Sequence, residues 1–376
     1  MTKVLVVATS EVHLNVFHVP YLALLAKMGA TVDVAVEVRR NQAVPHVHKI
    51  YNLPFKRTLA SFQLIKAFFG LKRLILAGGY DMVHCHTPIP AALTRIAARS
   101  LFKKGLVVMY TAHGFHFYKG APWYQYQLFF WTERLLARWT NVLITINSED
   151  YQTAKTHFPI RNIYHMKGIG VDTSRFQQAT SGAGAKIRQE LSFDQDDQVL
   201  VYVANMIRRK NHRFLLLAFS KLIKTHPRTK LLLVGSGELM HELKLYSESL
   251  QIDPFVRFVG FRSDVPDLLA SSDIAVSTSR HEGLGLALAE AMWAGLPVVA
   301  TQDRGHRELV NHGVTGYLFE QSNQEDLLIS LRTLLDNRKL ACMMGERGKL
   351  AVGAFSIKNS LDYMEKVYKT YLVTNA

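Results

Sequence analysis

Two glutamates and two glycines stand close together in the stretch from Ser279 to Thr301, SRHEGLGLALAEAMWAGLPVVAT. The pattern predicts a loop, then a helix, then a strand. Gly283 and Gly285 come just before the helix, where unpaired backbone N–H groups and the positive end of the helix dipole favour a phosphate. Glu290 lies about one turn into the helix, where a carboxylate can accept two hydrogen bonds from a ribose diol. The alternative is a surface helix whose first turn is stabilised by acidic side chains.

A basic loop is the second candidate for chemistry. Residues 203–211, VANMIRRKN, follow a strand-like run. When a nucleoside diphosphate departs, negative charge develops on its phosphate oxygens, and a fixed cation with backbone donors stabilises that charge. Lys210 is predicted to be this cation, with Arg208 or Arg209 beside it; a solvated basic loop is the alternative. Glu282 is expected in the loop before the helix, nearer to the group that the phosphates carry.

The elements that position these residues follow one alternating pattern. The chain has 376 residues, a length that suggests two compact domains. Short β-branched runs alternate with stretches of helical spacing, which indicates parallel sheets with helices on both faces. The expected strands are 3–8, 31–36, 82–84, 106–111, 142–145, 199–203, 230–234, 256–258, 274–277 and 297–301. The expected helices are 16–28, 59–77, 91–100, 123–139, 211–225, 240–250, 265–269 and 286–294.

The two halves of the pattern are similar. A Ser, Gly and Ala-rich segment, 179–185, breaks the alternation and is the predicted linker. The expected domains are residues 1–178 and 186–355, with a C-terminal helix, 356–376, that packs back on the first domain. Two such halves in tandem imply two doubly wound α/β domains facing each other across a cleft. Functional residues should then lie in the loops after the strands.

Composition excludes several classes of protein. Apolar residues make up 48% and charged residues 20%, so a mostly disordered chain is excluded. Two cysteines, Cys85 and Cys342, cannot form a disulfide framework, and they favour a reducing compartment, the cytosol. No apolar stretch reaches the length of a membrane span.

The net charge of +15 is concentrated in the first half. Residues 1–180 hold 21 lysines and arginines against 8 acidic residues, whereas residues 181–376 hold 24 against 22. A basic half favours an anionic surface or substrate, either lipid headgroups or nucleic acid.

Glu282 and Glu290 are spaced as in the E-x7-E motif, and the stretch resembles that of retaining GT-B glycosyltransferases of family four. These enzymes transfer sugars from nucleotide diphosphate donors without a metal. Other segments resemble family motifs along nearly the whole chain: 203–211 (the basic loop), 234–238 (V-G-x-G), 168–172 (G-V-D) and 313–319 (G-x-x-G-y-L-f). In the first half, 84–88 and 110–116 are similar to a bacterial subgroup that builds exopolysaccharide and capsule repeat units.

The resemblance implies a GT-B fold, with an acceptor-binding first domain and a donor-binding second domain, and it implies roles for single residues. Glu282 contacts the donor sugar, and His113 corresponds to a histidine near the transferred sugar, although hydrogen-bonded packing is the alternative for it. Asp172 and Glu308 are further candidates. The predicted catalytic residues are Glu282, Lys210, His113 and Arg208, and the predicted donor-binding residues are Glu290, Gly283, Leu284, Gly285, Leu286, Arg209, Gly235 and Arg262.

The chain departs from the family in two places. Many relatives have a Gly-Gly pair after the first strand, where this chain reads Thr9-Ser-Glu-Val-His13. Close approach of that loop to phosphates is therefore not expected, and Glu11 and His13, with His116, are assigned to the acceptor side. Asn205 stands where an arginine is common, which leaves the identity of the second cation open between Arg208 and Arg209.

Three motifs resemble metal sites but are not expected to bind metal. Asp194-x-Asp196 lies in a polar loop before a strand rather than after one. His46-x-His48 and His84-x-His86 each lack a third and a fourth ligand nearby in the sequence. No metal and no cofactor is expected, because the nucleotide sugar is a substrate.

Together these features favour a metal-independent retaining transferase. It would move a hexose or N-acetylhexosamine from a nucleotide sugar to a polyprenyl-diphosphate-linked oligosaccharide. The expected donor is a UDP-sugar. The helices 59–77 and 123–139 are basic and aromatic. Either they only cover the sheet, or they also touch anionic lipid, and the second case would place the protein on the cytoplasmic face of the cell membrane. One alternative is a nucleic-acid-binding protein, although no recognition helix or finger motif is present. Another is a sugar-nucleotide epimerase, which needs no acceptor.

Overall fold

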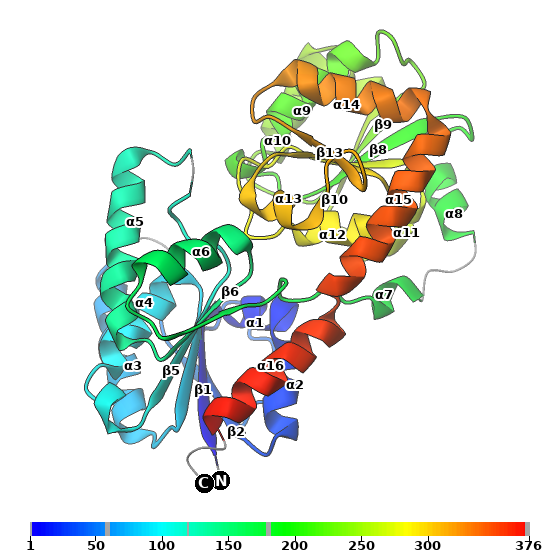
Figure 1. Ribbon diagram of the computed structural model, residues 1–376. Helices are drawn as coiled ribbons and strands as arrows, with labels where there is room; N and C mark the ends of the chain where they lie inside the picture. The colour runs from blue at the N-terminus through cyan, green and yellow to red at the C-terminus, as the bar shows by residue number, and fades with distance from the viewer. Residues whose placement is uncertain (1, 57–60, 119, 178–181, 373–376) are drawn as a thin grey trace. The chain divides into compact units, whose positions relative to one another are not determined.

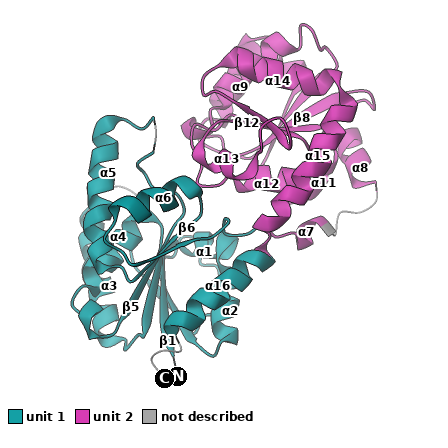
Figure 2. Ribbon diagram, in the orientation of Figure 1, with its two compact units in different colours: residues 1–170, 358–376 teal, residues 171–357 magenta. Residues whose placement is uncertain are grey.

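A computed structural model describes residues 2–56, 61–118, 120–177 and 182–372. The chain forms two compact units, Met1–Gly170 with Lys358–Ala376 and Val171–Ile357 (Figure 2). The first unit therefore ends at Gly170, before the predicted linker, part of which (179–181) lies outside the described residues. Among the described residues, no helix is both long and apolar enough to cross a membrane.

The first unit is built on a seven-stranded sheet in which all pairings are parallel, in the order β3-β2-β1-β4-β5-β6-β7. The predicted strands are present, and two strands were not predicted, β3 and β7, which form the two edges. Both are short and neither contains a buried residue, so they lack the apolar runs that identify a buried strand. The strands are β1 Lys3–Ser10, β2 Thr31–Glu37, β3 Lys49–Asn52, β4 Met82–His86, β5 Val107–Ala112, β6 Val142–Thr145 and β7 Asn162–His165.

Helices cover both faces of this sheet (Figure 1). One core lies between the sheet and α3, α4 and α6, where residues such as Leu71 and Ala97 pack on Val83 and Val108. The C-terminal α16 belongs to this unit, and its Tyr368 hydroxyl bonds to His84 at 2.9 Å. The helices are α1 Glu11–Phe17, α2 Val19–Lys27, α3 Phe62–Ala77, α4 Pro88–Ala98, α5 Trp123–Leu136, α6 Ser148–His157 and α16 Ile357–Leu372, with 3-10 turns η1 Phe102–Lys104 and η2 Ala137–Trp139.

The predicted helix 16–28 is wrong at its start. The structure has two helices, α1 and α2, which meet at His18. Pro20 stands in the first turn of α2, where its missing N–H costs nothing, whereas inside one continuous helix it would remove a hydrogen bond. The break directs the His18 side chain into the protein, where it is buried.

The second unit holds a six-stranded parallel sheet in the order β10-β9-β8-β11-β12-β13, so two parallel, doubly wound sheets are confirmed. The strand β13 was not predicted. The strands are β8 Gln198–Val203, β9 Thr229–Val234, β10 Val256–Gly260, β11 Ile274–Ser277, β12 Val298–Thr301 and β13 Gly316–Phe319. The helices are α7 Ser174–Gln177, α8 Ala183–Glu190, α9 His212–Leu222, α10 Met240–Ser249, α11 Val265–Ala270, α12 Leu286–Trp293, α13 Arg304–Leu309, α14 Gln324–Asp336 and α15 Arg338–Val352, with 3-10 turns η3 Arg208–Lys210, η4 Asp253–Phe255 and η5 Gly353–Phe355.

The strand order explains where the candidate residues lie. In each sheet the order reverses beside the first strand, between β1 and β4 and between β8 and β11. At such a switch point the two following loops diverge to opposite faces and leave a crevice at the strand ends. Glu11 and His13 follow β1 and His86 ends β4, while Lys210 follows β8 and Glu282 follows β11. Each unit therefore places its predicted residues at its own switch point.

Candidate active site

The loops after β8 and β11 are tied to each other by hydrogen bonds to the basic turn η3. The Tyr202 hydroxyl donates to the Lys210 carbonyl at 2.8 Å, and the Thr278 hydroxyl donates to the same carbonyl at 3.2 Å. The Arg280 N–H donates to the Arg209 carbonyl at 2.9 Å. These bonds fix the direction in which the two cationic side chains leave the backbone.

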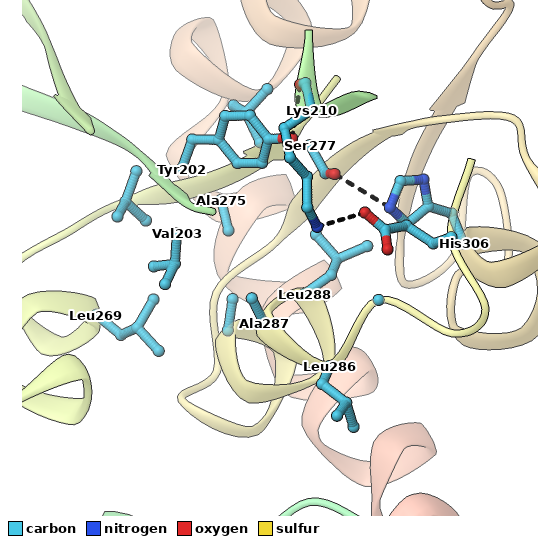
Figure 3. A pocket seen from close by; sticks show the side chains of 15 residues that line it. Tyr202, Val203, Lys210, Leu269, Ala275, Ser277, Leu286, Ala287, Leu288 and His306 are labelled. Carbon is cyan, nitrogen blue, oxygen red and sulfur yellow. Dashed lines mark hydrogen bonds and ion pairs between the residues drawn. The ribbon is translucent and has the colours of Figure 1, made fainter. Parts of the chain in front are cut away.

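The Glu282 carboxylate lies between two cations. Lys210 Nζ is 2.5 Å from Oε1, an ion pair that Figure 3 marks with a dashed line at the end of the Lys210 side chain. Arg209 Nη1 is 2.8 Å from Oε2. Burial alone would raise the pKa of Glu282, but the charges of Lys210 and Arg209 outweigh it and hold that pKa well below its usual range. Glu282 is therefore an anion at neutral pH, and it balances one of the two positive charges.

The backbone of Glu282 is fixed from the start of α13. The Asp303 carboxylate accepts the Glu282 N–H and, at 2.8 Å, the His306 N–H. Gly305 packs against the same loop: a Cβ there would lie 2.9 Å from the Glu282 Cβ and 2.9 Å from the Leu284 nitrogen. A glycine at 305 is thus required by close approach, and it sets the position of the loop.

His306 is a site residue that the sequence analysis missed. Its Nδ1 lies 2.9 Å from the Thr301 carbonyl, which can only accept, so Nδ1 carries a proton, while Nε2 lies 3.1 Å from the Ser277 hydroxyl. Figure 3 shows the Ser277 and Lys210 side chains on the same side of the imidazole. No motif in the sequence marks His306, because its role depends on three loops that meet only in the folded unit.

A cavity of about 40 Å³ lies among these groups, lined by Lys210, Glu282, Gly285 and His306 among others. It has room for about two or three waters. The bulk of a nucleotide sugar, which needs a site of several hundred Å³, has to lie outside it.

The start of α12 has the predicted form. Gly285 is its N-cap with φ +93°, a left-handed conformation that favours glycine, and a Cβ there would come within 3.1 Å of His306. Gly283, Leu284, Gly285 and Leu286 therefore run as a loop into the N-terminus of the helix, the end that favours an anion. The predicted order of loop, helix and strand β12 is confirmed.

Glu290 lies just beyond the first turn of α12, as predicted. Its carboxylate is 3.4 Å from Arg175 of α7, whose guanidinium also donates to the Ser263 carbonyl at 3.2 Å. Burial, aided by the charge of Asp172, raises the pKa of Glu290, and Arg175 opposes that rise. Arg175 was not predicted, since only the fold of the unit brings α7 to α12.

Three predicted site residues of the second unit, one catalytic and two donor-binding, are not brought to this cluster. Arg208 is exposed, and no bond of its side chain is seen within the described ranges, so Arg209 is the arginine that shares Glu282 with Lys210. Arg262 is held by Asp264 at 2.6 Å and Glu190 at 2.5 Å, which raise the pKa of Arg262. Gly235 packs so closely that a Cβ would collide with the Ala204 carbonyl. A catalytic role for Arg208 and donor binding by Arg262 and Gly235 stay predictions.

In the first unit, His113 belongs to a cluster of histidines. Its Nε2 lies 3.3 Å from His86 Nδ1, the His86 and His18 ring centroids are 4.1 Å apart, and His18 Nε2 lies 3.2 Å from His13 Nε2. His84 packs on His86. Burial lowers the pKa of His84 and of His113 to about 3, and it lowers the pKa of His18 and His86 well below the usual range. These four imidazoles are neutral at pH 7.

The sequence places no further ligand near His84 and His86, but in the folded unit other imidazoles lie beside them. Residues far apart in the sequence surround them, and ligand atoms of His13, His18 and His113 lie within 4.8 Å of one another. Within the described ranges, this trio is the one group of His, Cys, Asp or Glu side chains spaced to hold a metal ion. Neutral imidazoles are zinc ligands.

Two other predicted residues face elsewhere. Glu11 is buried, and one of its oxygens accepts the backbone N–H groups of Arg39, at 2.8 Å, and of Arg40. It thus holds the loop after β2. His116 is exposed and packs on Phe129 of α5, with ring centroids 5.3 Å apart. The acceptor-side roles of both stay predictions.

Comparison with known families covers most of the chain. The family model "Glycosyl transferases group 1" matches residues 184–351, and "Glycosyl transferase 4-like" matches residues 3–147. A curated relative from Bacillus subtilis (strain 168), "Putative glycosyltransferase EpsD", is 34% identical over 98% of this chain and 97% of its own length. The chain belongs to the group 1 glycosyltransferases. An Escherichia coli relative, "UDP-Gal:alpha-D-GlcNAc-diphosphoundecaprenol alpha-1,3-galactosyltransferase", is 28% identical over 83% of this chain and 81% of its own.

Solved structures of other glycosyltransferases share the fold. HepE of Anabaena in complex with UDP and glucose has a TM-score of 0.78 at 20% identity and covers 98% of this chain and 100% of its own. The sucrose-phosphate synthase of Thermosynechococcus elongatus has a TM-score of 0.81 at 19% identity, and both chains are fully covered. The group 1 glycosyltransferase described here therefore has the GT-B fold.

Proposed function

We propose that this glycosyltransferase retains the anomeric configuration, works without a metal, and transfers a hexose or N-acetylhexosamine from a UDP-sugar to a polyprenyl-diphosphate-linked oligosaccharide. The reaction is proposed to belong to exopolysaccharide or capsule synthesis. The observation that carries it is the Glu282 carboxylate between Lys210 and Arg209, one loop before the N-terminus of α12. The names of the Escherichia coli and Bacillus subtilis relatives support the acceptor class and the process.

In this proposal the second unit stabilises the leaving group. The bond between the anomeric carbon and the β-phosphate oxygen breaks, and the negative charge that develops on the diphosphate is met by Lys210, Arg209 and the N–H groups at the start of α12. Glu290 accepts hydrogen bonds from the ribose hydroxyls, while Glu282 contacts the sugar. Because the two cations are already placed around Glu282, little reorganisation accompanies the reaction.

The acceptor hydroxyl attacks from the face that the diphosphate leaves. A bond forms between the acceptor oxygen and the anomeric carbon, and the hydroxyl proton passes to the departing phosphate oxygen, so no protein nucleophile is needed. His113, which burial keeps neutral, is proposed to hydrogen-bond the transferred sugar. This step is what would give retention of configuration.

The first unit is proposed to meet the acceptor at a membrane surface. The exposed faces of α3 and α5 combine apolar side chains with cations, and basic residues near an anionic bilayer add on the order of 1 kcal/mol each. The proposal places the protein on the cytoplasmic face of the cell membrane as a peripheral protein. Flotation with anionic and with neutral liposomes tests this, and equal recovery in both would contradict it.

The experiment that tests the enzymatic proposal combines a donor panel with product analysis. UDP-, GDP- and dTDP-sugars are incubated with a crude lipid-linked acceptor, and the products are identified by mass spectrometry. The expected product carries one added hexose or N-acetylhexosamine from a UDP donor, with the configuration retained and no effect of EDTA. Absence of turnover with every donor would refute the proposal, and strong inhibition by EDTA would refute metal independence.

A further inference from the structure

A wide groove runs between α3, α4 and α5 on the first unit. It encloses about 700 Å³, within the usual range for small-molecule sites, and its walls are almost entirely apolar. The side chains that form them include Phe62, Ile65, Leu93, Ile96, Leu128 and Phe129. A contiguous apolar surface of this kind costs free energy in water, and on a folded protein it marks a binding site.

The groove is rigid at its base. Arg95 of α4 and Glu133 of α5 form a two-pronged ion pair, with N to O distances of 2.7 and 3.1 Å, and both side chains are buried. The Arg95 guanidinium also lies 4.3 Å from the Tyr110 ring centroid. Such bidentate pairs fix geometry as well as adding energy, so α4 and α5 are held apart at a set distance and the groove is preformed.

One end of the groove reaches the histidine-bearing strand ends. Pro88 and Ile89, which line it, follow β4 and His86 directly in the chain. Phe129, also a lining residue, packs on His116 of the loop after β5. A ligand whose polar head lies near these histidines could therefore continue into the groove with an apolar tail.

The stretch of chain that forms the groove is strongly basic. From Phe62 to Arg138 the sequence holds ten lysines and arginines but only two acidic residues, Asp81 and Glu133. Both acids are engaged, Asp81 by the Lys3 N–H at 2.7 Å and Glu133 by Arg95. A stretch with this net positive charge favours an anionic over a cationic ligand.

We propose that this groove binds the isoprenoid chain of a polyprenyl-diphosphate-linked acceptor, with the diphosphate and sugar at the ends of β4 and β5. The occupant is a single lipid chain drawn out of the bilayer, because the surface is concave and preformed rather than a flat amphipathic face. This inference rests on the proposed function for the identity of the acceptor, but it also predicts lipid binding that can be measured without any donor or transfer.

The test compares a groove variant with a matched control. The groove variant carries Phe62→Gln, Ile65→Asn and Leu128→Gln, at side chains that are 89%, 55% and 58% exposed, so the fold should tolerate the changes. The control carries Phe261→Gln, Ile329→Asn and Leu245→Gln in the second unit, at 80%, 55% and 52% exposure. Binding of farnesyl diphosphate and of inorganic diphosphate is measured by calorimetry without vesicles, with excess UDP present.

Wild type and control are expected to bind farnesyl diphosphate at least tenfold more tightly than inorganic diphosphate, since burial of two methylene groups is worth about a factor of ten. The groove variant should lose most of that preference and keep its weak affinity for inorganic diphosphate. Equal affinity of the groove and control variants for farnesyl diphosphate would overturn the proposal. The proposal would also be overturned if the groove variant no longer floated with acceptor-free vesicles but bound farnesyl diphosphate as tightly as wild type, because the surface would then dock on a bilayer.

Two further readouts separate the remaining outcomes. If the groove variant alone converts a dimer to a monomer in light scattering, the groove is an interface between copies and the proposal is wrong. Transfer is then measured with acceptors that carry the same sugar on chains of two or of eleven isoprene units. The groove variant should raise KM for the long chain about tenfold more than for the short one, and equal effects would refute the proposal. Selective farnesyl diphosphate binding without any transfer would refute the proposed function and leave the isoprenoid site standing.

Discussion

Replacing Glu282 by Gln should lower the stability of the second unit without weakening the binding of UDP. The substitution keeps the shape of the side chain and removes the anion between Lys210 and Arg209. The carboxylate and the Lys210 side chain are nearly buried, whereas Arg209 is about one third exposed. The cost should therefore lie between that of an exposed pair, below 1 kcal/mol, and that of a fully buried pair, about 3–5 kcal/mol. We expect a loss of about 2 kcal/mol in the free energy of unfolding of the second unit, or about 4–8 °C in Tm.

The same variant should bind free UDP at least as tightly as wild type. In the proposed function the diphosphate supplies negative charge to the two cations, one of whose charges Glu282 balances in the free enzyme, so UDP should also raise the Tm of Glu282→Gln more than that of wild type. Lys210→Met removes a charge-assisted hydrogen bond and should weaken UDP binding about 10- to 100-fold. Both variants should lose at least 100-fold in turnover.

Calorimetry with UDP and thermal unfolding with and without it make the comparison. The control is Asp196→Asn, which removes a charge from an exposed pair with Arg228 and should change Tm by no more than about 1 °C. It also tests the Asp194-x-Asp196 motif, whose loss should leave activity unchanged. If Glu282→Gln weakened UDP binding as much as Lys210→Met does, or left Tm unchanged, the reasoning about charge balance would be refuted.

Three other substitutions test separate parts of the structure. Glu290→Gln should weaken binding of UDP about tenfold and leave binding of inorganic diphosphate unchanged in calorimetry; an equal loss for both ligands would contradict a ribose contact. The pKa of His84 is about 3 in the folded protein and about 6.5 in the unfolded chain. As pH falls below 6.5 the unfolded chain takes up the proton first, so the free energy of unfolding falls, by about 2 kcal/mol at pH 5 from this residue. The Tm of His84→Gln should therefore fall less than that of wild type between pH 7 and pH 5, and an equal fall would count against a buried neutral imidazole. Gly235→Ala should lower the free energy of unfolding in urea by about 3 kcal/mol, because a Cβ there meets the Ala204 carbonyl. Gly295→Ala, where φ is positive but the space around it is open, should lower it by about 1 kcal/mol. Equal losses would show that the collision at residue 235 is relieved.

The local pattern was enough to predict the strands and helices around the site. Central strands such as β8 and β11 are short apolar runs between polar turns, and the start of α12 is marked by Gly285. These features depend on neighbours in the chain, so periodicity and turn chemistry reveal them. The edge strands β3 and β7, which contain no buried residue, were missed because they carry no such run.

Sequence alone thus determined that two parallel sheets form and that a glycine-bearing loop leads into a helix after β11, and it assigned Glu282, Glu290 and Lys210 to one predicted site. Only the tertiary structure decided that Arg209 rather than Arg208 shares Glu282, that His306 and Arg175 join the site, and that His13, His18 and His113 come together. The difference has one physical cause. A residue's secondary structure depends on the few residues beside it, whereas its partners are set by which loops meet when parallel strands from distant parts of the chain pair side by side.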